Sequence, residues 1–364
     1  MMVVSKQHQI FFDFLRFCIG SDSEIPSSFK EADWKVLYRI AQKQCLGGIL
    51  FDGIQKLPPT EVGMSKDLLL QWMLQCQMLE KANVRQNDAV IQVSEWFRKK
   101  GFRTCILKGQ GNALMYPNPY SRTPGDIDIW VEGGDKRVIS FVRSISPHEK
   151  ACYHHIEFPS YKSVEVEVHY RPSFLLCFWH NRKLQKYYER VKEEQFSHRV
   201  MLGEQGEIAI PTVEFNLIFQ LTHIFSHLMN EGIGLRQLLD YYYVLISADL
   251  SLIRDRVQKE LKKLGLWKFA GAIMYIMQEV FGMPASRLIV PPNEKYGRFV
   301  LNEVLEAGNF GKHDARNRFG RSKLGHNLQR VYRDMRLVRY FPAEAMSEPF
   351  FRVWHFFWRL KHRR

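Results

Sequence analysis

Two aspartates, Asp126 and Asp128, alternate with isoleucines in residues 126–131, which read DIDIWV. Polar and apolar residues that alternate with a period of two predict a β-strand, so both aspartates point to the same face of it. Two carboxylates about 7 Å apart on one strand face repel each other, and a protein that places them there usually supplies a cation. Oxygen ligands with no cysteine nearby favour Mg²⁺, with Mn²⁺ as an alternative. An ordinary strand whose aspartates face solvent is the competing interpretation.

A metal site of this kind needs a third carboxylate on a neighbouring strand. Residues 163–170, which read SVEVEVHY, alternate so regularly that they predict the clearest strand of the chain. Its valines are expected to pack on a core, which leaves Glu165, Glu167 and His169 on the opposite face, where the aspartate pair could meet them. The alternation does not choose between the two glutamates.

A glycine turn precedes the aspartates. Residues 104–107 form a short apolar run that predicts a buried strand, and the Lys108–Gly109 turn with a second glycine at Gly111 leads into a brief helix beginning near Asn112. The order Lys-Gly, then Arg-x-x-x-Asp-x-Asp, then Glu-x-His resembles the uncharacterised nucleotidyltransferase family of the DNA polymerase β-like superfamily. It resembles more remotely the nucleotidyltransferase toxins and the aminoglycoside nucleotidyltransferases. The similarity extends from the first helices to roughly residue 245.

The resemblance implies an enzyme that moves a nucleoside monophosphate from a nucleoside triphosphate such as ATP to an acceptor hydroxyl and releases pyrophosphate, with two Mg²⁺ ions, or Mn²⁺, as cofactors. The acceptor is left open as a small molecule, a sugar, a protein or RNA. The implied catalytic and metal-binding residues are Asp126, Asp128 and Glu167. The implied nucleotide-binding residues are Lys108, Gly109, Gln110, Gly111 and Arg122. The residues proposed to line the cleft are His169, His223, Arg236 and Asp240.

Three other features carry alternative interpretations. His223 and His227 lie four apart on a predicted helix and could bind zinc, but the sequence lacks the glutamate of H-E-x-x-H, so a core or supporting role is expected. Arg236 and Asp240 are also one helical turn apart, and either form an intrahelical ion pair or line the cleft. The adjacent pair His154–His155 is expected not to bind a metal, since neighbouring strand residues face opposite ways.

The predicted fold class is α+β, with a small mixed β-sheet nucleotidyltransferase core between an N-terminal helical region and a C-terminal helical bundle. The expected boundaries are 1–100 for the N-terminal helices, 101–211 for the α/β core, 212–311 for the bundle and 312–364 for a basic aromatic tail. Residues 65–100 predict one long helix or two helices with a break near 83–87. A hairpin is expected to turn at Pro159–Ser160.

Composition is consistent with a globular protein, because 46% of the 364 residues are hydrophobic. The six cysteines are dispersed with no C-x-x-C spacing, and the chain lacks both a signal-peptide pattern and an uncharged apolar run of about 18 residues. These features predict reduced cysteines, no transmembrane segment and a cytoplasmic location.

The net charge of +14 is concentrated at the end of the chain, where residues 312–364 contain 14 basic and 4 acidic side chains. Aromatic residues are interleaved with these cations. The tail is expected to contact nucleic acid or an anionic surface, or to pack its aromatics on the bundle while its cations face solvent. Three further functions stay open: a toxin-like enzyme that modifies tRNA, a nucleotide-binding regulator without catalysis, and a scaffold at a membrane surface.

Overall fold

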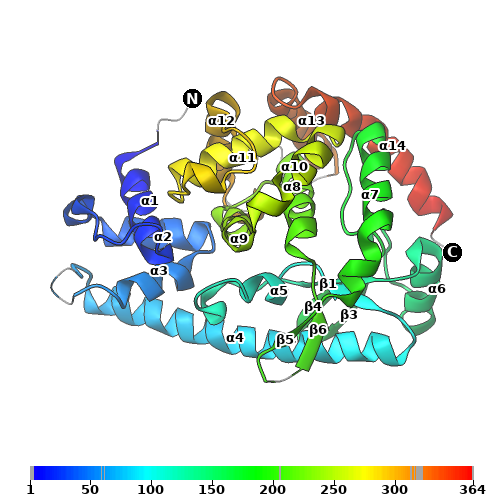
Figure 1. The fold of residues 1–364 in the computed structure, drawn as a ribbon, viewed down its shortest axis with the longest axis horizontal. Coiled ribbons are helices and arrows are strands. Elements are labelled where there is room, and N and C mark those ends of the chain that lie inside the picture. Colours follow the sequence, from blue (N-terminus) through cyan, green and yellow to red (C-terminus); the bar gives the residue numbers. More distant parts are fainter. Residues whose placement is uncertain are drawn as a thin grey trace.

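The computed structural model describes residues 4–58, 60, 62–204, 206–311, 314, 316 and 323–362, and the fold is α+β, as expected (Figure 1). The N-terminal helices are α1 Lys6–Ile19, η1 Ser27–Glu31, α2 Trp34–Lys43, α3 Gly47–Ile54 and α4 Lys66–Lys99. The middle of the chain contains β1 Thr104–Ile106, α5 Gln110–Ala113, η3 Pro119–Ser121, β2 Ile127–Val131, α6 Gly134–Ile145, β3 His155–Tyr161, β4 Val164–His169, α7 Phe178–Ser197, β5 Arg199–Leu202 and β6 Gly206–Ala209. The C-terminal helices are α8 Val213–Asn230, α9 Leu235–Ser247, α10 Leu250–Lys263, α11 Trp267–Glu279, η4 Ala285–Arg287, α12 Glu294–Ala307, η5 Asn309–Gly311, α13 Lys323–Leu337 and α14 Pro342–Lys361.

The central sheet is mixed and has the strand order β1-β2-β4-β3. β2 runs parallel to β4, and the outer strands β1 and β3 are antiparallel to their neighbours. The hairpin turns at Lys162 and Ser163, both with positive φ, so the expected turn at Pro159–Ser160 was wrong. β3 continues through Pro159 because its pairing with β4 is irregular between Phe158 and Tyr161, where a proline without an N–H is tolerated.

Helix α4 is one unbroken helix of 34 residues that runs beneath both the N-terminal helices and the sheet (Figure 1). The polar stretch that suggested a break is instead buried against the loop before β2. Asn83 Nδ2 donates to the carbonyl of Arg122 at 2.9 Å, and Gln86 Nε2 donates to the carbonyl of Gly125 at 2.8 Å. Helix α4 therefore holds the loop that leads into the paired aspartates.

Two clusters of buried apolar residues stabilise the molecule. The smaller one lies between one face of the sheet and helices α4 and α6, and includes Ile127, Ile129 and Val168. The larger one includes Trp72 of the N-terminal helices and Phe219 of the C-terminal bundle, so these two helical regions share one core. The division of the chain into the expected residue ranges stays a prediction.

Helix α14 packs one face on the α/β core and exposes the other. The ring of Phe351 stacks on Phe174, with centroids 5.1 Å apart, and Trp358 packs against the smaller core cluster. On the outer face, Phe350 is 78% exposed and Phe357 is 62% exposed. The tail thus rests on the edge of the core rather than only on the bundle, and the rest of residues 312–322 and the last two residues lie outside the described part of the chain.

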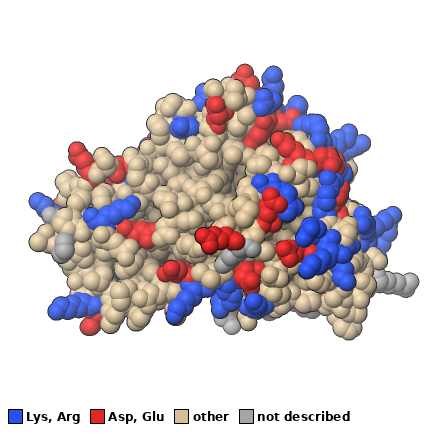
Figure 2. Space-filling model, turned by 60° about the horizontal axis from the view of Figure 1, so that its bottom comes forward, with Lys and Arg blue, Asp and Glu red and all other residues tan. Residues whose placement is uncertain are grey.

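Basic side chains gather on the right-hand side of Figure 2, with acidic side chains among them, and do not form an unbroken basic surface on that face. In the described part of the chain, no helix is long and apolar enough to cross a membrane. All six cysteines are free thiols, as the spacing predicted.

Candidate active site

The register of the central strands brings the three predicted carboxylates together. Asp128 on β2 is paired with Glu167 on the parallel strand β4. Asp126 immediately precedes β2, and one carboxylate oxygen from each of Asp126, Asp128 and Glu167 lies within 4.8 Å of the others. Glu165 is exposed and stands outside this group. The register therefore selects Glu167, where the alternation left two glutamates open.

Asp128 lies between two basic side chains. Lys108 Nζ is 2.9 Å from its Oδ2, and His169 Nε2 is 3.0 Å from its Oδ1. Burial alone would raise the pKa of Asp128, but Lys108 and His169 hold it well below its usual range. For His169 burial acts in the opposite direction and would lower the pKa, but the carboxylates of Asp128 and Glu167 raise it to about 9. The aspartate charge is thus balanced by groups that a metal ion could replace.

The other two carboxyl groups differ in their electrostatic surroundings. The charge of Asp128, together with burial, raises the pKa of Asp126 to about 6. Burial would raise the pKa of Glu167, but His169 and His155 keep it below its ordinary value. Three carboxylates this close, one of them resisting ionisation, form the oxygen-rich donor set that Mg²⁺ prefers. The residues therefore fit a divalent cation.

The turn after β1 requires glycine at one position. Gly109 has φ +55° and ψ −116°, a conformation that side-chain-bearing residues rarely adopt, and its Cβ position faces the carbonyl of Asp126 at 3.8 Å. The turn directs Lys108 back onto Asp128, where its Nζ also lies 2.9 Å from His223 Nε2. Gly109 thus positions the lysine against the carboxylates.

Two of the predicted nucleotide-binding residues, Gln110 and Gly111, do not line the cavities of the site. The four-residue helix α5 begins at Gln110 rather than near Asn112, and the Gln110 amide is buried and donates to Asn87 on α4. Gly111 lies against the side chain of Ile210. Neither Gln110 nor Gly111 lines the cavities that reach Asp126, so their role stays a prediction.

A buried ion pair forms the base of the site. Arg122 donates to Asp240 through Nε at 2.7 Å and Nη2 at 2.8 Å, and Tyr116 Oη donates to the same carboxylate at 2.6 Å. Arg236 Nη1 donates to the carbonyl of Thr123 at 2.9 Å. Asp240 therefore pairs with an arginine 118 positions away in sequence, rather than with its helical neighbour alone.

Two cavities meet at the aspartate pair. The smaller one is lined by eight of the predicted residues: Lys108, Gly109, Arg122, Asp126, Asp128, His223, Arg236 and Asp240. It is also lined by three buried or part-buried amides that the sequence did not single out, Asn112, Gln220 and Gln237. Gln220 Nε2 donates to Asn112 Oδ1 at 3.1 Å. For Gln220 and Gln237, the signal in the sequence was an amide within the apolar pattern of helices α8 and α9.

The larger cavity measures about 860 Å³ and opens from the same carboxylates. The sheet contributes Glu167 and His169, and helix α8 contributes His223 and His227. Helix α14 closes another side with Glu348, Phe351, Arg352 and His355. The sequence did not identify these four residues as part of the site. It shows that charged and aromatic residues are interleaved in the tail, but not on which side of the core the tail packs.

His154 and His155 line the larger cavity together, so the expectation that they face opposite ways was wrong. β3 begins only at His155, and alternation does not apply to the residue before the strand. His154 Nε2 lies 3.1 Å from His155 Nδ1, and His155 Nδ1 lies 3.2 Å from Glu167 Oε2. The sheet edge thus adds imidazoles to the carboxylate site.

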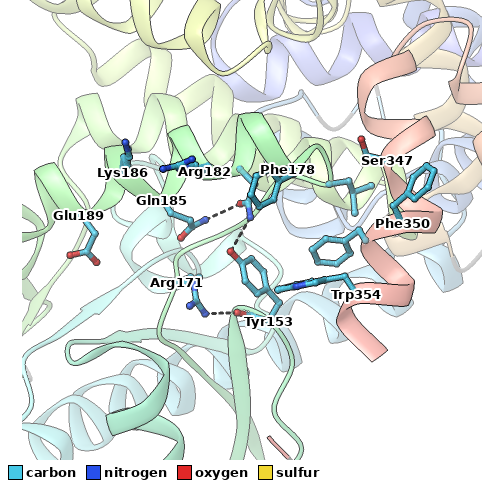
Figure 3. Close-up of a pocket in the computed structure, with 13 residues that line it drawn as sticks. Tyr153, Arg171, Phe178, Arg182, Gln185, Lys186, Glu189, Ser347, Phe350 and Trp354 are labelled. Carbon is cyan, nitrogen blue, oxygen red and sulfur yellow. Dashed lines mark hydrogen bonds between the residues drawn. The ribbon is translucent and has the colours of Figure 1, made fainter. Parts of the chain in front are cut away.

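An apolar groove of about 710 Å³ lies beside the larger cavity (Figure 3). Tyr153, Leu176 and Phe351 line both spaces and separate them. Helix α7 provides Arg182 and Lys186 along one side of the groove, and α14 provides aromatic rings on the other. An aromatic wall facing cations suits an anionic group that carries an apolar or aromatic portion.

Residues 30–282 match the family model described as uncharacterised nucleotidyltransferase. The match includes the carboxylates, the glycine turn and the Arg122–Asp240 pair, and it ends before α12. No curated protein matches the chain in sequence.

Proposed function

The chain belongs to the uncharacterised nucleotidyltransferase family, and we propose that it transfers a nucleoside monophosphate from a nucleoside triphosphate to an acceptor hydroxyl with the help of two Mg²⁺ ions. One observation carries the proposal. The oxygens of Asp126, Asp128 and Glu167 lie within 4.8 Å of one another, and Lys108, which contacts Asp128, lines the larger cavity with them. Carboxylates in this arrangement bind the pair of ions used in in-line phosphoryl displacement.

Asp126, Asp128 and Glu167 would hold the ions, which supply Lewis acidity at the phosphate oxygens. The acceptor oxygen attacks the α-phosphorus, the bond from that phosphorus to the bridging oxygen breaks, and pyrophosphate leaves. Glu167 is the carboxylate placed to take the hydroxyl proton, because it lines the larger cavity but not the smaller one. The proton thus passes to a carboxylate on the wall of the larger cavity.

Lys108 is the cation proposed to contact the triphosphate directly, while Arg122, which is bonded to Asp240, adds positive charge at the base of the smaller cavity. Lys108 Nζ contacts Asp128 in this structure and can donate instead to a phosphate oxygen once the carboxylate has a metal partner. Arg122 and Arg236 line the same cavity, which measures about 30 Å³, so only phosphate oxygens of the triphosphate are proposed to enter there. The acceptor then reaches the carboxylates from the larger cavity.

Calorimetric titration with each of the four nucleoside triphosphates, in Mg²⁺, tests the proposal. Wild type is expected to bind at least one of them. Mutation of a residue that only hydrogen-bonds to a metal ligand typically costs 10–100-fold in metal affinity. The double variant Asp126→Asn, Asp128→Asn changes the ligands themselves, so it is expected to lose more than about 100-fold in affinity for the triphosphate. Equal binding by the double variant, or no binding of any triphosphate by wild type, would refute the proposal.

Two matched substitutions on β4 distinguish a loss of catalysis from a general loss of structure. Glu167→Gln and Glu165→Gln are the same substitution on the same strand face, but Glu165 is exposed and stands outside the carboxylate group. Transfer from an α-labelled triphosphate is expected to be lost in Glu167→Gln and retained in Glu165→Gln. Full transfer by Glu167→Gln would remove its role as base.

RNA is the acceptor that a specific observation favours. The groove beside the larger cavity combines Arg182 and Lys186 with aromatic rings, among them Phe178, which is 65% exposed. Bases stack on such rings while cations contact the backbone phosphates. Incubation of the protein with an α-labelled triphosphate and total tRNA tests this acceptor. Label that enters RNA supports it, and label found only in small products or protein argues against it.

A further inference from the structure

His169 places a ring nitrogen between two of the site carboxylates. Its Nε2 lies 3.0 Å from Asp128 Oδ1 and 3.4 Å from Glu167 Oε2. Nε2 is buried and makes no hydrogen bond of acceptable geometry within the described part of the chain. His155 Nδ1 lies 3.2 Å from the same Glu167 oxygen. Two carboxylate oxygens and two imidazole nitrogens thus lie close together at the edge of the sheet.

These separations match the spacing of ligands around one metal ion. Adjacent ligands of an octahedral ion lie about 3 Å apart when each bond is about 2.1 Å long, and those of a tetrahedral ion lie slightly further apart. His155, Glu167 and His169 each offer a ligand atom, and all of these atoms lie within 4.8 Å of one another. Little movement is needed to place a cation among them.

The second ring nitrogen of His169 orients the first. Nδ1 lies 3.3 Å from the carbonyl oxygen of Arg171. A carbonyl only accepts hydrogen bonds, so Nδ1 carries a proton. A metal would therefore bind at Nε2 and displace the proton that this nitrogen carries while it faces the carboxylates. A ligating histidine is commonly held by this kind of contact through its other nitrogen.

The donor set selects the kind of metal. Mg²⁺ binds oxygen ligands and rarely imidazole, whereas Mn²⁺, Fe²⁺, Co²⁺ and Zn²⁺ accept both nitrogen and carboxylate ligands. We propose that Asp128, Glu167 and His169, with His155 at the edge, form a nitrogen-containing site for a transition-metal dication. Asp126, with the shared oxygens of Asp128 and Glu167, forms the adjoining oxygen-only position that suits Mg²⁺.

The two positions face different cavities. Asp126 and Asp128 line both cavities, whereas His155, Glu167 and His169 line the larger cavity and not the smaller one. The nitrogen-containing site therefore lies on the side where the acceptor is proposed to enter. This inference rests on the proposed function only in the placement of the acceptor, because the metal site itself follows from the side chains.

Pulsed electron paramagnetic resonance with Mn²⁺ alone, on full-length protein without a histidine tag or nucleotide, tests the site. Mn²⁺ at half the protein concentration is expected to show coupling to ¹⁴N of imidazole in wild type. The coupling is expected to weaken in His169→Gln and to disappear in the double variant His155→Gln, His169→Gln. It is expected to persist in His227→Gln, a histidine on α8 that lines the same cavity outside the ligand set. Bound Mn²⁺ without ¹⁴N coupling in wild type would overturn the proposal, whatever the variants do.

Calorimetry with Mn²⁺ and with Mg²⁺ measures the same site independently. His169→Gln is expected to weaken Mn²⁺ binding by more than about tenfold while Mg²⁺ binding changes little. His155→Gln, which is less buried, provides a second variant should His169→Gln fail to fold, as judged by circular dichroism. Unchanged Mn²⁺ affinity in folded His169→Gln, or no Mn²⁺ binding by wild type, refutes the site.

The outcomes also separate this inference from the proposed function. Metal-dependent binding of a triphosphate without ¹⁴N coupling leaves the proposed function standing and refutes the imidazole site. ¹⁴N-coupled Mn²⁺ in a protein that binds no triphosphate leaves the metal site standing and refutes the proposed function.

Discussion

At the scale of the residue, Asp240 is the most heavily bonded carboxylate near the site. It accepts two hydrogen bonds from Arg122 and one from Tyr116, and all three side chains are buried. Asp240→Ala is expected to lower the free energy of unfolding by about 3–5 kcal/mol, because it leaves the charge of Arg122 buried without a counter-charge. Urea unfolding followed by tryptophan fluorescence measures the loss.

An exposed ion pair provides the control. Arg256 Nη2 lies 2.7 Å from Glu214 Oε2, with 60% and 37% of the two side chains exposed. Glu214→Ala is expected to cost less than about 1 kcal/mol, since solvent screens such pairs. If Asp240→Ala cost no more than Glu214→Ala, the buried pair would not be a source of stability.

The residues of the site differ in how far sequence could predict their positions. The common face of Asp126 and Asp128 follows from strand alternation, which is a local property of the backbone. Alternation places both Glu165 and Glu167 on one face, so only the family resemblance singled out Glu167 from the sequence. The pairing of β2 with β4 sets Glu167 beside Asp128. The contact of Arg122 with Asp240 joins distant segments, so the chain pattern offered only its helical neighbour as a partner.

At the scale of the element, helix α7 receives its N-terminal cap from α14. Cys177 at the N-cap makes no side-chain capping bond. The carboxylate of Glu344 accepts hydrogen bonds from the N–H groups of Leu176 at 2.6 Å and Cys177 at 3.1 Å. Glu344→Ala is expected to cost about 1.5–3 kcal/mol, because it removes charged hydrogen bonds from buried donors near a helix N-terminus. Thermal unfolding by circular dichroism measures the cost.

Glu344→Gln is the matched variant, since it keeps the shape and one acceptor oxygen but removes the charge. It is expected to recover part of the stability lost in Glu344→Ala. A melting temperature of Glu344→Ala equal to that of wild type would mean that α14 does not cap α7 in solution.

A histidine on α14 makes the docking of this helix depend on pH. His355 Nε2 accepts a hydrogen bond from the backbone N–H of Tyr153 at 3.1 Å. Burial, with a smaller contribution from Arg359, lowers the pKa of His355 from 6.5 to about 4. The unfolded chain therefore binds this proton at higher pH than the folded chain, so the stabilisation is complete above pH 6.5 and is lost as pH falls toward 4.

His355→Gln tests this dependence, because glutamine can accept the same hydrogen bond but does not titrate. The free energy of unfolding of the variant, measured between pH 7 and 4.5, is expected to fall less steeply than that of wild type. Parallel curves for the two proteins would contradict a contribution from His355.

The elements were predictable where their causes were local. The strong alternation of β4 and the Thr212 cap of α8 lie where the pattern placed them. Of the two alternatives for residues 65–100, the single helix is correct. The polar residues that suggested a break, among them Asn83 and Gln86, make tertiary hydrogen bonds, which a sequence pattern does not distinguish from exposure to solvent. The hairpin turn was misplaced because Pro159 is accommodated by an irregular strand pairing.

At the scale of the whole molecule, the two cavities of the site are lined by different parts of the chain. The smaller cavity is lined by residues between Lys108 and Asp240, all within the family match. The larger cavity is closed in part by α13 and α14, which lie beyond residue 282, where the match ends. The mixed sheet and its flanking helices followed from pattern, whereas the return of the tail to the sheet depends on contacts such as Phe351 with Phe174 that no local pattern encodes.

Removing residues 312–364 should therefore separate triphosphate binding from stability. The truncated chain keeps every residue that lines the smaller cavity, so its affinity for the triphosphate in Mg²⁺ is expected to stay within about threefold of wild type, since no phosphate or metal contact is removed. It loses the cap from Glu344 and uncovers the apolar surface around Phe174 and Leu176, so its melting temperature is expected to fall by several degrees. Calorimetry and circular dichroism measure the two effects.

Full-length Phe351→Ala, His355→Ala is the companion variant, because it weakens the docking of α14 without shortening the chain and stays informative should the truncated protein not fold. Its triphosphate affinity is expected to match that of wild type, while transfer to any acceptor falls, because the wall of the larger cavity is displaced. Loss of triphosphate binding in this variant, with its circular dichroism spectrum unchanged, would show that the two cavities act as one. The assignment of triphosphate binding to the smaller cavity and of acceptor binding to the wall formed by α14 would then have to be abandoned, since triphosphate binding would itself depend on α14.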